Sequence, residues 1–226
     1  MKKYILAACM IATVVVGSFC MMHITRIAAS RTYDALGGVV IVLDSGHGGK
    51  DDGARSNEAK EQDINLKIAQ KLKKLLEDSG AQVIMTRDGP YDLASAQATN
   101  RKREDMKKRV EIINNEKTDL FLSIHLNSYP NTSVKGAQAF YSPKNEVAKV
   151  FADIVQKHFK TLTKTKMTSK PGDYYILNNT SKIGALVECG FLSNPEDRSN
   201  LIEDSYQQKV AQTLYDSILE YFNFLS

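Results

Sequence analysis

The stretch VVIVLDSGHGGKDDGA, residues 39–54, constrains the fold of this chain more than any other. Its first five residues are apolar, and after Asp44 the pattern changes to a glycine-rich turn that contains His47. An apolar run that ends in a turn signal predicts a buried strand of a parallel sheet. Ligands of open α/β sheets bind beyond the carboxyl ends of the strands, so His47 is expected where such a fold performs chemistry.

Strand and helix patterns alternate along the rest of the chain. This alternation predicts one α/β domain, with a twisted, mostly parallel sheet of about six strands flanked by helices. Apolar residues at helical spacing predict helices at 62–78, 102–116, 145–160 and 206–222, whereas short apolar runs predict strands at 39–44, 81–86, 119–125, 136–141, 173–178 and 183–188. Residues 161–172 are expected to be a linker and residues 190–198 a loop.

The N-terminus carries an apolar segment without charged residues. It covers residues 4–22 and approaches the ~20 residues that cross a bilayer as a helix. A cleaved signal peptide is the alternative, but its apolar region is usually shorter and is followed by a small-x-small cleavage site. We therefore interpret residues 1–31 as an uncleaved signal-anchor with a connector, which would form a membrane-anchor helix, and residues 32–226 as the folded domain.

The net charge of +4 comes from the N-terminal segment alone. That segment holds Lys2, Lys3, Arg26 and Arg31 and no acidic residue, so the predicted domain has 26 basic and 26 acidic residues. A neutral domain gives no electrostatic reason to bind nucleic acid.

Two histidines and a glutamate are candidates for a metal site. His125 ends a predicted strand, as His47 does, and Glu61 opens the first predicted helix on the side that faces the sheet. Two imidazoles and a carboxylate match an open catalytic zinc site, which leaves one position to water. Glu58 is a second candidate for the role of Glu61. The alternative is that the two histidines and the glutamate have unrelated structural roles.

Glu188 is the candidate for a general base that is not a metal ligand. It ends an apolar strand, where a buried carboxylate is costly unless it has a partner. A salt-bridged or capping glutamate is the alternative. The neighbouring Cys189 could suggest a thiol nucleophile, but a lone cysteine more often packs as a small apolar residue. His158 lies within a predicted helix and is expected to be a helix-face residue.

Four segments in order, DSGHGGKDDGA, EQDINLKIAQKL, LFLSIHLNS and ALVECGFLSNPED, resemble the signatures of the zinc-dependent N-acetylmuramoyl-L-alanine amidases, the amidase_3 family. The resemblance runs from about residue 39 to the C-terminus. It implies that His47, Glu61 and His125 bind zinc (Zn2+), with Glu61 rather than Glu58 in the second signature. It also implies that Glu188 is the catalytic carboxylate, and that the protein acts on peptidoglycan outside the cytoplasm.

Within this family, the anchor and the stretches VIMTRDGPYDLA and SIHLNSYPN resemble sporulation amidases of endospore-forming bacteria. That resemblance implies cleavage of the bond between N-acetylmuramic acid and L-alanine in spore cortex, on the route to the muramic-δ-lactam that germination requires. The protein would then lie between the forespore membranes, anchored or secreted. Ser45 replaces a common proline and Cys189 a common aliphatic residue, but neither change removes a ligand.

Candidates for binding glycan or the carboxylates of the stem peptide are Asn127, Ser128, Arg87 and Arg109, with surface solvation as the alternative for each arginine. A protein partner that activates the enzyme or retains its zinc is left open. Alternative functions are a catalytically silent glycan-binding or scaffold protein and a zinc carboxypeptidase. A phosphate-binding loop would need a helix directly after the glycines, whereas a polar loop extends to about Lys60.

Overall fold

A computed structural model describes residues 35–56, 59–115 and 117–225 of the chain. The predicted signal-anchor, residues 1–31, lies outside the described residues. Within the described ranges, none of the helices combines the length and the apolar character that a membrane span needs.

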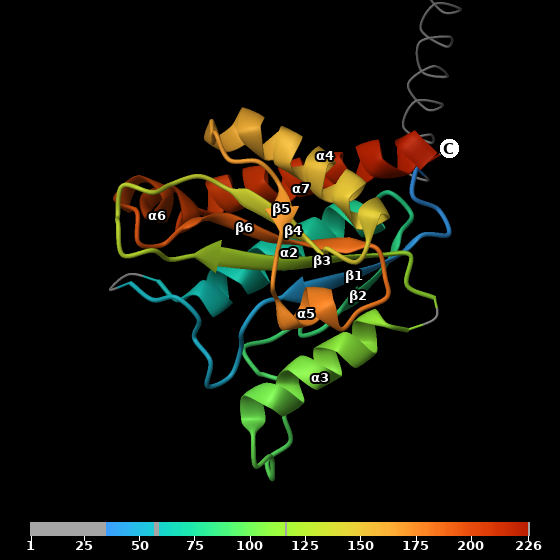
Figure 1. Ribbon diagram of the computed structural model, residues 1–226, viewed down its shortest axis with the longest axis horizontal. Helices are drawn as coiled ribbons and strands as arrows, with labels where there is room; N and C mark the ends of the chain where they lie inside the picture. Colours follow the sequence, from blue (N-terminus) through green and yellow to red (C-terminus); the bar gives the residue numbers. More distant parts are fainter. Residues whose placement is uncertain (1–34, 57–58, 116, 226) are drawn as a thin grey trace, which may run out of the picture.

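A six-stranded sheet forms the centre of the domain (Figure 1), and its strands in chain order are β1 (Val40–Ser45), β2 (Gln82–Met85), β3 (Leu120–Asn127), β4 (Gln138–Tyr141), β5 (Lys170–Pro171) and β6 (Gly184–Phe191). Their order across the sheet is β2-β1-β3-β6-β4-β5. The pairs β1–β2, β1–β3, β3–β6 and β4–β5 are parallel, whereas β4 runs antiparallel to β6. The expectation of a mostly parallel sheet is confirmed.

Helices cover both faces of this sheet (Figure 1). One face carries α2 (Glu61–Glu77), α4 (Glu146–Thr163) and α7 (Asp204–Leu225), and the other carries α3 (Arg101–Ile113) and α5 (Tyr175–Asn178). The short α6 (Pro195–Leu201) contacts α7 and β6. The domain is therefore a three-layer α/β structure.

The apolar character of β1 follows from its position between these layers. Successive residues of a strand point to opposite faces, so Ile41 and Leu43 belong to the core under α2, α4 and α7, whereas Val42 packs on the side of α3. All three side chains are fully buried. A strand covered on both faces has no polar alternation, which explains the continuous apolar run.

The strand predicted at residues 173–178 is wrong. Tyr175–Asn178 forms α5, a single helical turn whose Ile176 and Leu177 pack into the core beside α3. The sixth strand is instead β5, a two-residue strand within the predicted linker. Periodicity does not separate a buried helical turn from a strand in so short an apolar run.

The loop predicted at residues 190–198 is shorter than expected. Strand β6 continues to Phe191, and α6 begins at Pro195. The side chain of Asn194 caps this helix by accepting hydrogen bonds from the backbone N–H groups of Glu196 and Asp197. The capping residue and the proline in the first turn are the local signals that start it.

Candidate metal centre and active site

His47 lies in the loop that follows β1, and its backbone has a left-handed φ of 63°. A residue with a side chain rarely adopts this conformation, and such positions persist where the surroundings stabilise them. Two arginine side chains do so here. Arg87 Nε donates to the carbonyl oxygen of His47 at 2.7 Å, and Arg109 Nη2 donates to the same oxygen at 2.5 Å.

Arg87 and Arg109 lie beneath this loop, and the side chain of each is about fully buried, at 1% exposure. That they bind substrate carboxylates stays a prediction, and Arg109 lines the active-site cavity, but the acceptors that the structure gives their N–H groups are oxygens of the protein itself. Besides His47, Arg87 donates to the carbonyl oxygens of Ser45, Gly46, Gln62 and Gly89, and Arg109 donates to that of Ser45 and to the carboxylates of Asp44 and Asp105.

Asp44 provides the buried negative charge between these elements. Its burial alone would raise the pKa of the carboxyl group, but the Arg109 guanidinium and the hydrogen bond from Ser123 outweigh that effect and lower the pKa. The Arg109 Nη1 to Asp44 Oδ1 distance is 2.8 Å, and that from Ser123 Oγ to Asp44 Oδ2 is 2.6 Å. Through Asp44, these two contacts therefore join α3 and β3 to the carboxyl end of β1.

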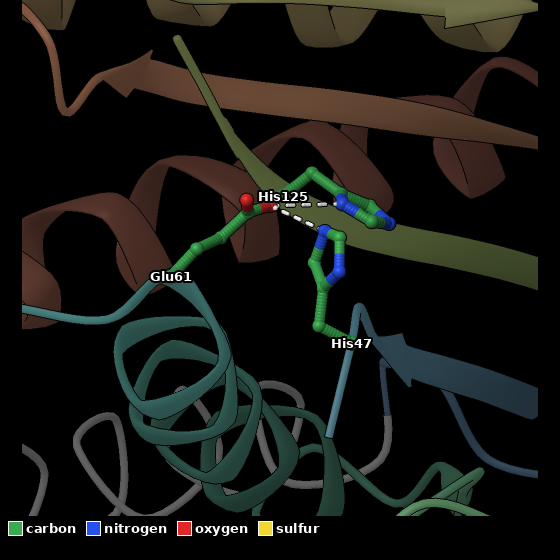
Figure 2. Close-up of side chains that lie close together, drawn as sticks. All are labelled: His47, Glu61 and His125. Carbon is green, nitrogen blue, oxygen red and sulfur yellow. Dashed lines mark hydrogen bonds and ion pairs between the residues drawn. The ribbon is translucent and has the colours of Figure 1, made fainter. Parts of the chain in front are cut away.

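His47, Glu61 and His125 converge above the carboxyl ends of β1 and β3 (Figure 2). Glu61 Oε1 lies 3.1 Å from His47 Nε2 and 3.0 Å from His125 Nδ1. One ligand atom from each side chain lies within 4.8 Å of the others. The structure thus brings together the three residues that the sequence predicted, although Glu61 and His125 are 64 positions apart.

The donor set fits a zinc ion, because two imidazoles and one carboxylate are typical ligands of an open catalytic site. The surroundings orient them as a metal site requires. Glu61 Oε2 accepts from the backbone N–H of Ala54 at 2.7 Å, and Glu61 Oε1 accepts from that of Leu126 at 3.0 Å. His47 Nδ1 lies 3.0 Å from Asp51 Oδ2, and a carboxylate on the second nitrogen is the usual partner of a metal-binding histidine.

Two glycines, which have no side chains, make room for the side chains of the metal ligands. A Cβ on Gly46 would lie 2.2 Å from His125 Cε1, and a Cβ on Gly53 would lie 2.5 Å from Glu61 Oε2. Gly53 also has a φ of 67°. The loop can therefore approach the ligand set this closely only without side chains at these positions.

Glu61 is held in its charged form. Burial would raise the pKa of its carboxyl group, but the hydrogen bonds and charges of His125 and His47 lower it well below the usual range. A permanently charged carboxylate between two imidazoles suits a cation.

Glu188 lies beside this ligand set, since it is the register partner of His125 in the pairing of β6 with β3. The side chain projects to the same face as Leu186, towards α5, and the residue is 7% exposed. Its Oε2 has no hydrogen-bond partner among the described residues. Burial raises its pKa to about 7, with Glu61 adding to the rise and His125 and His47 opposing it. A carboxyl group that titrates near neutral pH suits proton transfer.

A cavity of about 490 Å³ contains the three ligands and Glu188. Asn127 and Ser128 line it too, as a substrate-binding role would require, but their role stays a prediction. Tyr174 lines the cavity as well, and sequence reasoning missed it because its segment was expected to be a strand. Burial and the charges of Glu188 and Glu61 raise the pKa of Tyr174 to about 12, so its hydroxyl stays protonated.

Asp51 and Lys102 were also missed. Asp51 belongs to the polar loop and is the fourth residue after His47, a spacing that could have suggested a partner for that imidazole. Lys102 lies in the first turn of α3 and forms an ion pair with Asp51, 51 positions away in the chain. Only the fold brings this pair together.

Cys189 and His158 have structural roles, as the sequence predicted. Cys189 is buried within β6 and belongs to the core under α2, α4 and α7, and burial raises the pKa of its thiol. His158 Nε2 on α4 lies 2.9 Å from Glu220 Oε2 on α7. The helix after the glycine loop begins only at Glu61, so the loop lacks the helix N-terminus that a phosphate-binding loop needs.

Comparisons with known proteins agree on one family. The family model for N-acetylmuramoyl-L-alanine amidase (Amidase_3) matches residues 41–220. The germination-specific N-acetylmuramoyl-L-alanine amidase of Bacillus subtilis (strain 168) is 40% identical over 194 residues, which are 83% of this chain and 81% of that protein.

Solved structures give the same result. The CwlD amidase of Clostridioides difficile, in complex with the GerS lipoprotein, matches with a TM-score of 0.79 and 36% identity, over 82% of this chain and 99% of that one. The catalytic domain of CwlV from Bacillus (Paenibacillus) polymyxa var. colistinus matches with a TM-score of 0.73 and 31% identity, over 82% of this chain and 98% of that one. The chain therefore belongs to the Amidase_3 family of N-acetylmuramoyl-L-alanine amidases.

Proposed function

We propose that this protein hydrolyses the amide bond between N-acetylmuramic acid and L-alanine in peptidoglycan, and that zinc is its cofactor. The observation that carries the proposal is the ligand set of His47, Glu61 and His125 beside Glu188 in one cavity. Membership of an amidase family and the germination-specific relative support it.

In this reaction His47, Glu61 and His125 would hold the zinc ion. Zinc supplies Lewis acidity, which polarises the amide carbonyl and makes water a stronger nucleophile. Glu188 accepts the proton of the attacking water and then donates it to the leaving amine of L-alanine. In the metal-free protein burial raises the pKa of Glu188 to about 7, and a carboxyl group with a pKa near neutrality can both accept and donate a proton.

We further propose that the substrate is spore cortex, on the route to the muramic-δ-lactam that germination requires. The name of the Bacillus subtilis relative supports this assignment. The protein would then act outside the cytoplasm, in the space between the forespore membranes, where residues 1–31 anchor it to a membrane unless they are removed.

A protein partner that activates the enzyme or retains its zinc belongs to the proposal. It is supported by the Clostridioides difficile relative, whose structure contains the GerS lipoprotein. The expected result is that an extract of sporulating cells raises both the zinc content and the rate of cleavage. An unchanged zinc content and rate would count against the partner.

The test is digestion of cortex muropeptides by the purified full-length protein, with mass analysis of the products. An amidase releases a stem peptide with a free L-alanine amine and leaves muramic acid without a stem. A carboxypeptidase removes only the C-terminal residue, and a scaffold protein binds without product. Glu188→Gln is the matched control, because it is expected to keep zinc and lose activity by several orders of magnitude. Cleavage that persists in this variant would remove Glu188 from its role.

A further inference from the structure

A second cavity of about 470 Å³ lies beside the candidate active site. It is lined by the charged residues Lys50, Asp51, Asp92, Arg101, Lys102 and Asp105. Among the described residues, Lys102 is the only one that lines both cavities. The two cavities therefore adjoin at Lys102, in the first turn of α3.

A substrate that enters this region meets several carboxylates. Glu61 and Glu188 line the first cavity, and three acidic and three basic side chains line the second. A peptidoglycan stem is itself anionic, because the residue after L-alanine carries a carboxylate that its peptide linkage does not use. Like charges placed together cost free energy, so a cation with free N–H donors beside these carboxylates would favour binding of an anionic stem.

The arginines that line the two cavities are already bound to carboxylates of the protein. Arg101 donates from Nε and from Nη2 to Asp92, at 2.7 Å each. Arg109 is fully buried and holds Asp44.

Lys102 differs from these arginines. Its side chain is 58% exposed, and its ammonium group contacts Asp51 Oδ2. An ammonium group has three N–H donors, so this single contact leaves donors for a ligand.

The contact with Asp51 also fixes the position of Lys102 relative to the metal centre. Asp51 Oδ2 lies 3.0 Å from His47 Nδ1, so one carboxylate separates the ammonium group from a ligand histidine. A peptide residue two positions beyond the scissile amide lies ~7 Å from it. A carboxylate on that residue is therefore within reach of Lys102.

We propose that Lys102 binds the free carboxylate on the stem residue that follows L-alanine, and that it makes the enzyme prefer stems with this carboxylate over stems in which it is an amide. The inference rests on the proposed function. Asp51 holds the ammonium group in place from the protein side, and the substrate carboxylate takes its remaining N–H groups.

The experiment compares two synthetic muropeptides that differ only at this group, one with the carboxylate and one with the primary amide. KM and kcat are measured for the full-length, zinc-loaded protein, for Lys102→Met and for Lys102→Arg. The wild type is expected to show a KM about tenfold higher for the amide, as loss of one charge-assisted hydrogen bond predicts. Lys102→Met is expected to bring the ratio of the two KM values close to one, and Lys102→Arg to restore most of it.

Lys108→Met is the matched control. Lys108 lies on the same helix, pairs with Glu104 at 2.9 Å and lines neither cavity, so the KM ratio is expected to stay at the wild-type value. Zinc content is measured for every variant. A role of Lys102 through Asp51 and His47 alone would lower zinc content or kcat and leave the KM ratio unchanged, and that result would overturn the proposal.

Failure of this inference is distinguishable from failure of the proposed function. Release of stem peptide by the wild type, with equal KM values for the two muropeptides, rejects the role of Lys102 and keeps the amidase. Absence of stem release from either muropeptide by the zinc-loaded wild type, also after addition of an extract of sporulating cells, rejects both.

Discussion

At the scale of single residues, two glutamates beside the same site have opposite pKa shifts. Hydrogen bonds and charges from two histidines outweigh burial at Glu61 and lower its pKa, whereas burial dominates at Glu188 and raises its pKa to about 7. One carboxylate is thereby suited to hold a cation, and the other to carry a proton. Different surroundings of the same group assign different chemical roles.

The raised pKa of Glu188 predicts that the free energy of unfolding of the metal-free protein depends on pH. Folding raises this pKa from 4.5 to about 7, so the folded state loses stability as the pH rises through that interval. The full effect corresponds to about 3 kcal/mol. The difference in free energy of unfolding between Glu188→Gln and the wild type is therefore expected to change by about 3 kcal/mol in favour of the variant as the pH rises from about 4 to about 8. Urea unfolding of zinc-free protein measures it, and a pH-independent difference would contradict the prediction.

Glu61→Ala is expected to abolish zinc binding. The substitution removes a ligand and leaves the N–H groups of Ala54 and Leu126 without their acceptor. Metal analysis should find about one zinc per chain in the wild type and almost none in the variant. Glu188→Gln, whose side chain is not a proposed ligand, should retain the ion. Full zinc content in Glu61→Ala would show that the ion binds elsewhere.

Gly46→Ala is expected to displace His125, because the added Cβ would lie 2.2 Å from the imidazole ring. The predicted results are a lower zinc affinity and a loss of about 1–3 kcal/mol in the free energy of unfolding. Gly89→Ala is the control, since its Cβ would meet only the ring of Tyr91, an exposed side chain that can move. Equal zinc affinity in the two variants would argue against steric control of His125 by Gly46.

At the scale of elements, the glycine loop after β1 is fixed by side chains from β2's end and from α3. Arg87 follows β2, Arg109 belongs to α3, and both donate to the carbonyl oxygen of His47. The left-handed backbone of His47 is thus supported by two separate elements. The orientation of the His47 imidazole therefore depends on the packing of α3 against the sheet.

Arg109→Met is expected to lower the free energy of unfolding by about 3–5 kcal/mol, because it leaves Asp44 buried without its cation. The double variant Asp44→Asn with Arg109→Met should lose less than the sum of the two single variants, since it removes both charges. Chemical denaturation of the four proteins of this cycle gives the coupling energy. Additive losses would show that the pair contributes no such coupling.

At the scale of the whole molecule, the site lies where the carboxyl ends of β1, β3 and β6 meet the N-terminus of α2. His47 follows β1, His125 and Glu188 lie in the C-terminal halves of β3 and β6, and Glu61 opens the helix. A bound ion would therefore join segments that are distant in the chain. Its removal should affect the stability of the entire domain.

Removal of zinc by a chelator is expected to lower Tm. A ligand present at a hundred times its Kd stabilises the folded state by about 2.7 kcal/mol, which corresponds to roughly 5–10 °C for a domain of this size. Scanning calorimetry with and without chelator measures the shift. Glu61→Ala should show no change on chelation, and a shift of equal size in that variant would point to an ion outside this site.

The central strands, the ligand candidates and the family resemblance follow from local patterns of residues in the chain. Residues 39–44, 119–125 and 183–188 are apolar because both faces of these strands are covered, and a polar residue at a strand end then stands out. His47, His125 and Glu188 were found in this way, and Glu61 was found by its place at the start of the first helix and by the family resemblance. All four line one cavity.

Which polar residues stabilise the fold and which line the cavity depends on contacts between segments that are far apart in the chain. Arg87 and Arg109 were predicted to bind substrate, whereas the acceptors that the structure gives them are oxygens of the protein. Both donate to the carbonyl oxygen of His47, which is 40 and 62 positions away. Tyr174 and Lys102 line the cavity because α5 and α3 pack on that face of the sheet. Local sequence patterns indicate burial and turns. The partners of a buried charge, in contrast, come from segments that meet only after folding.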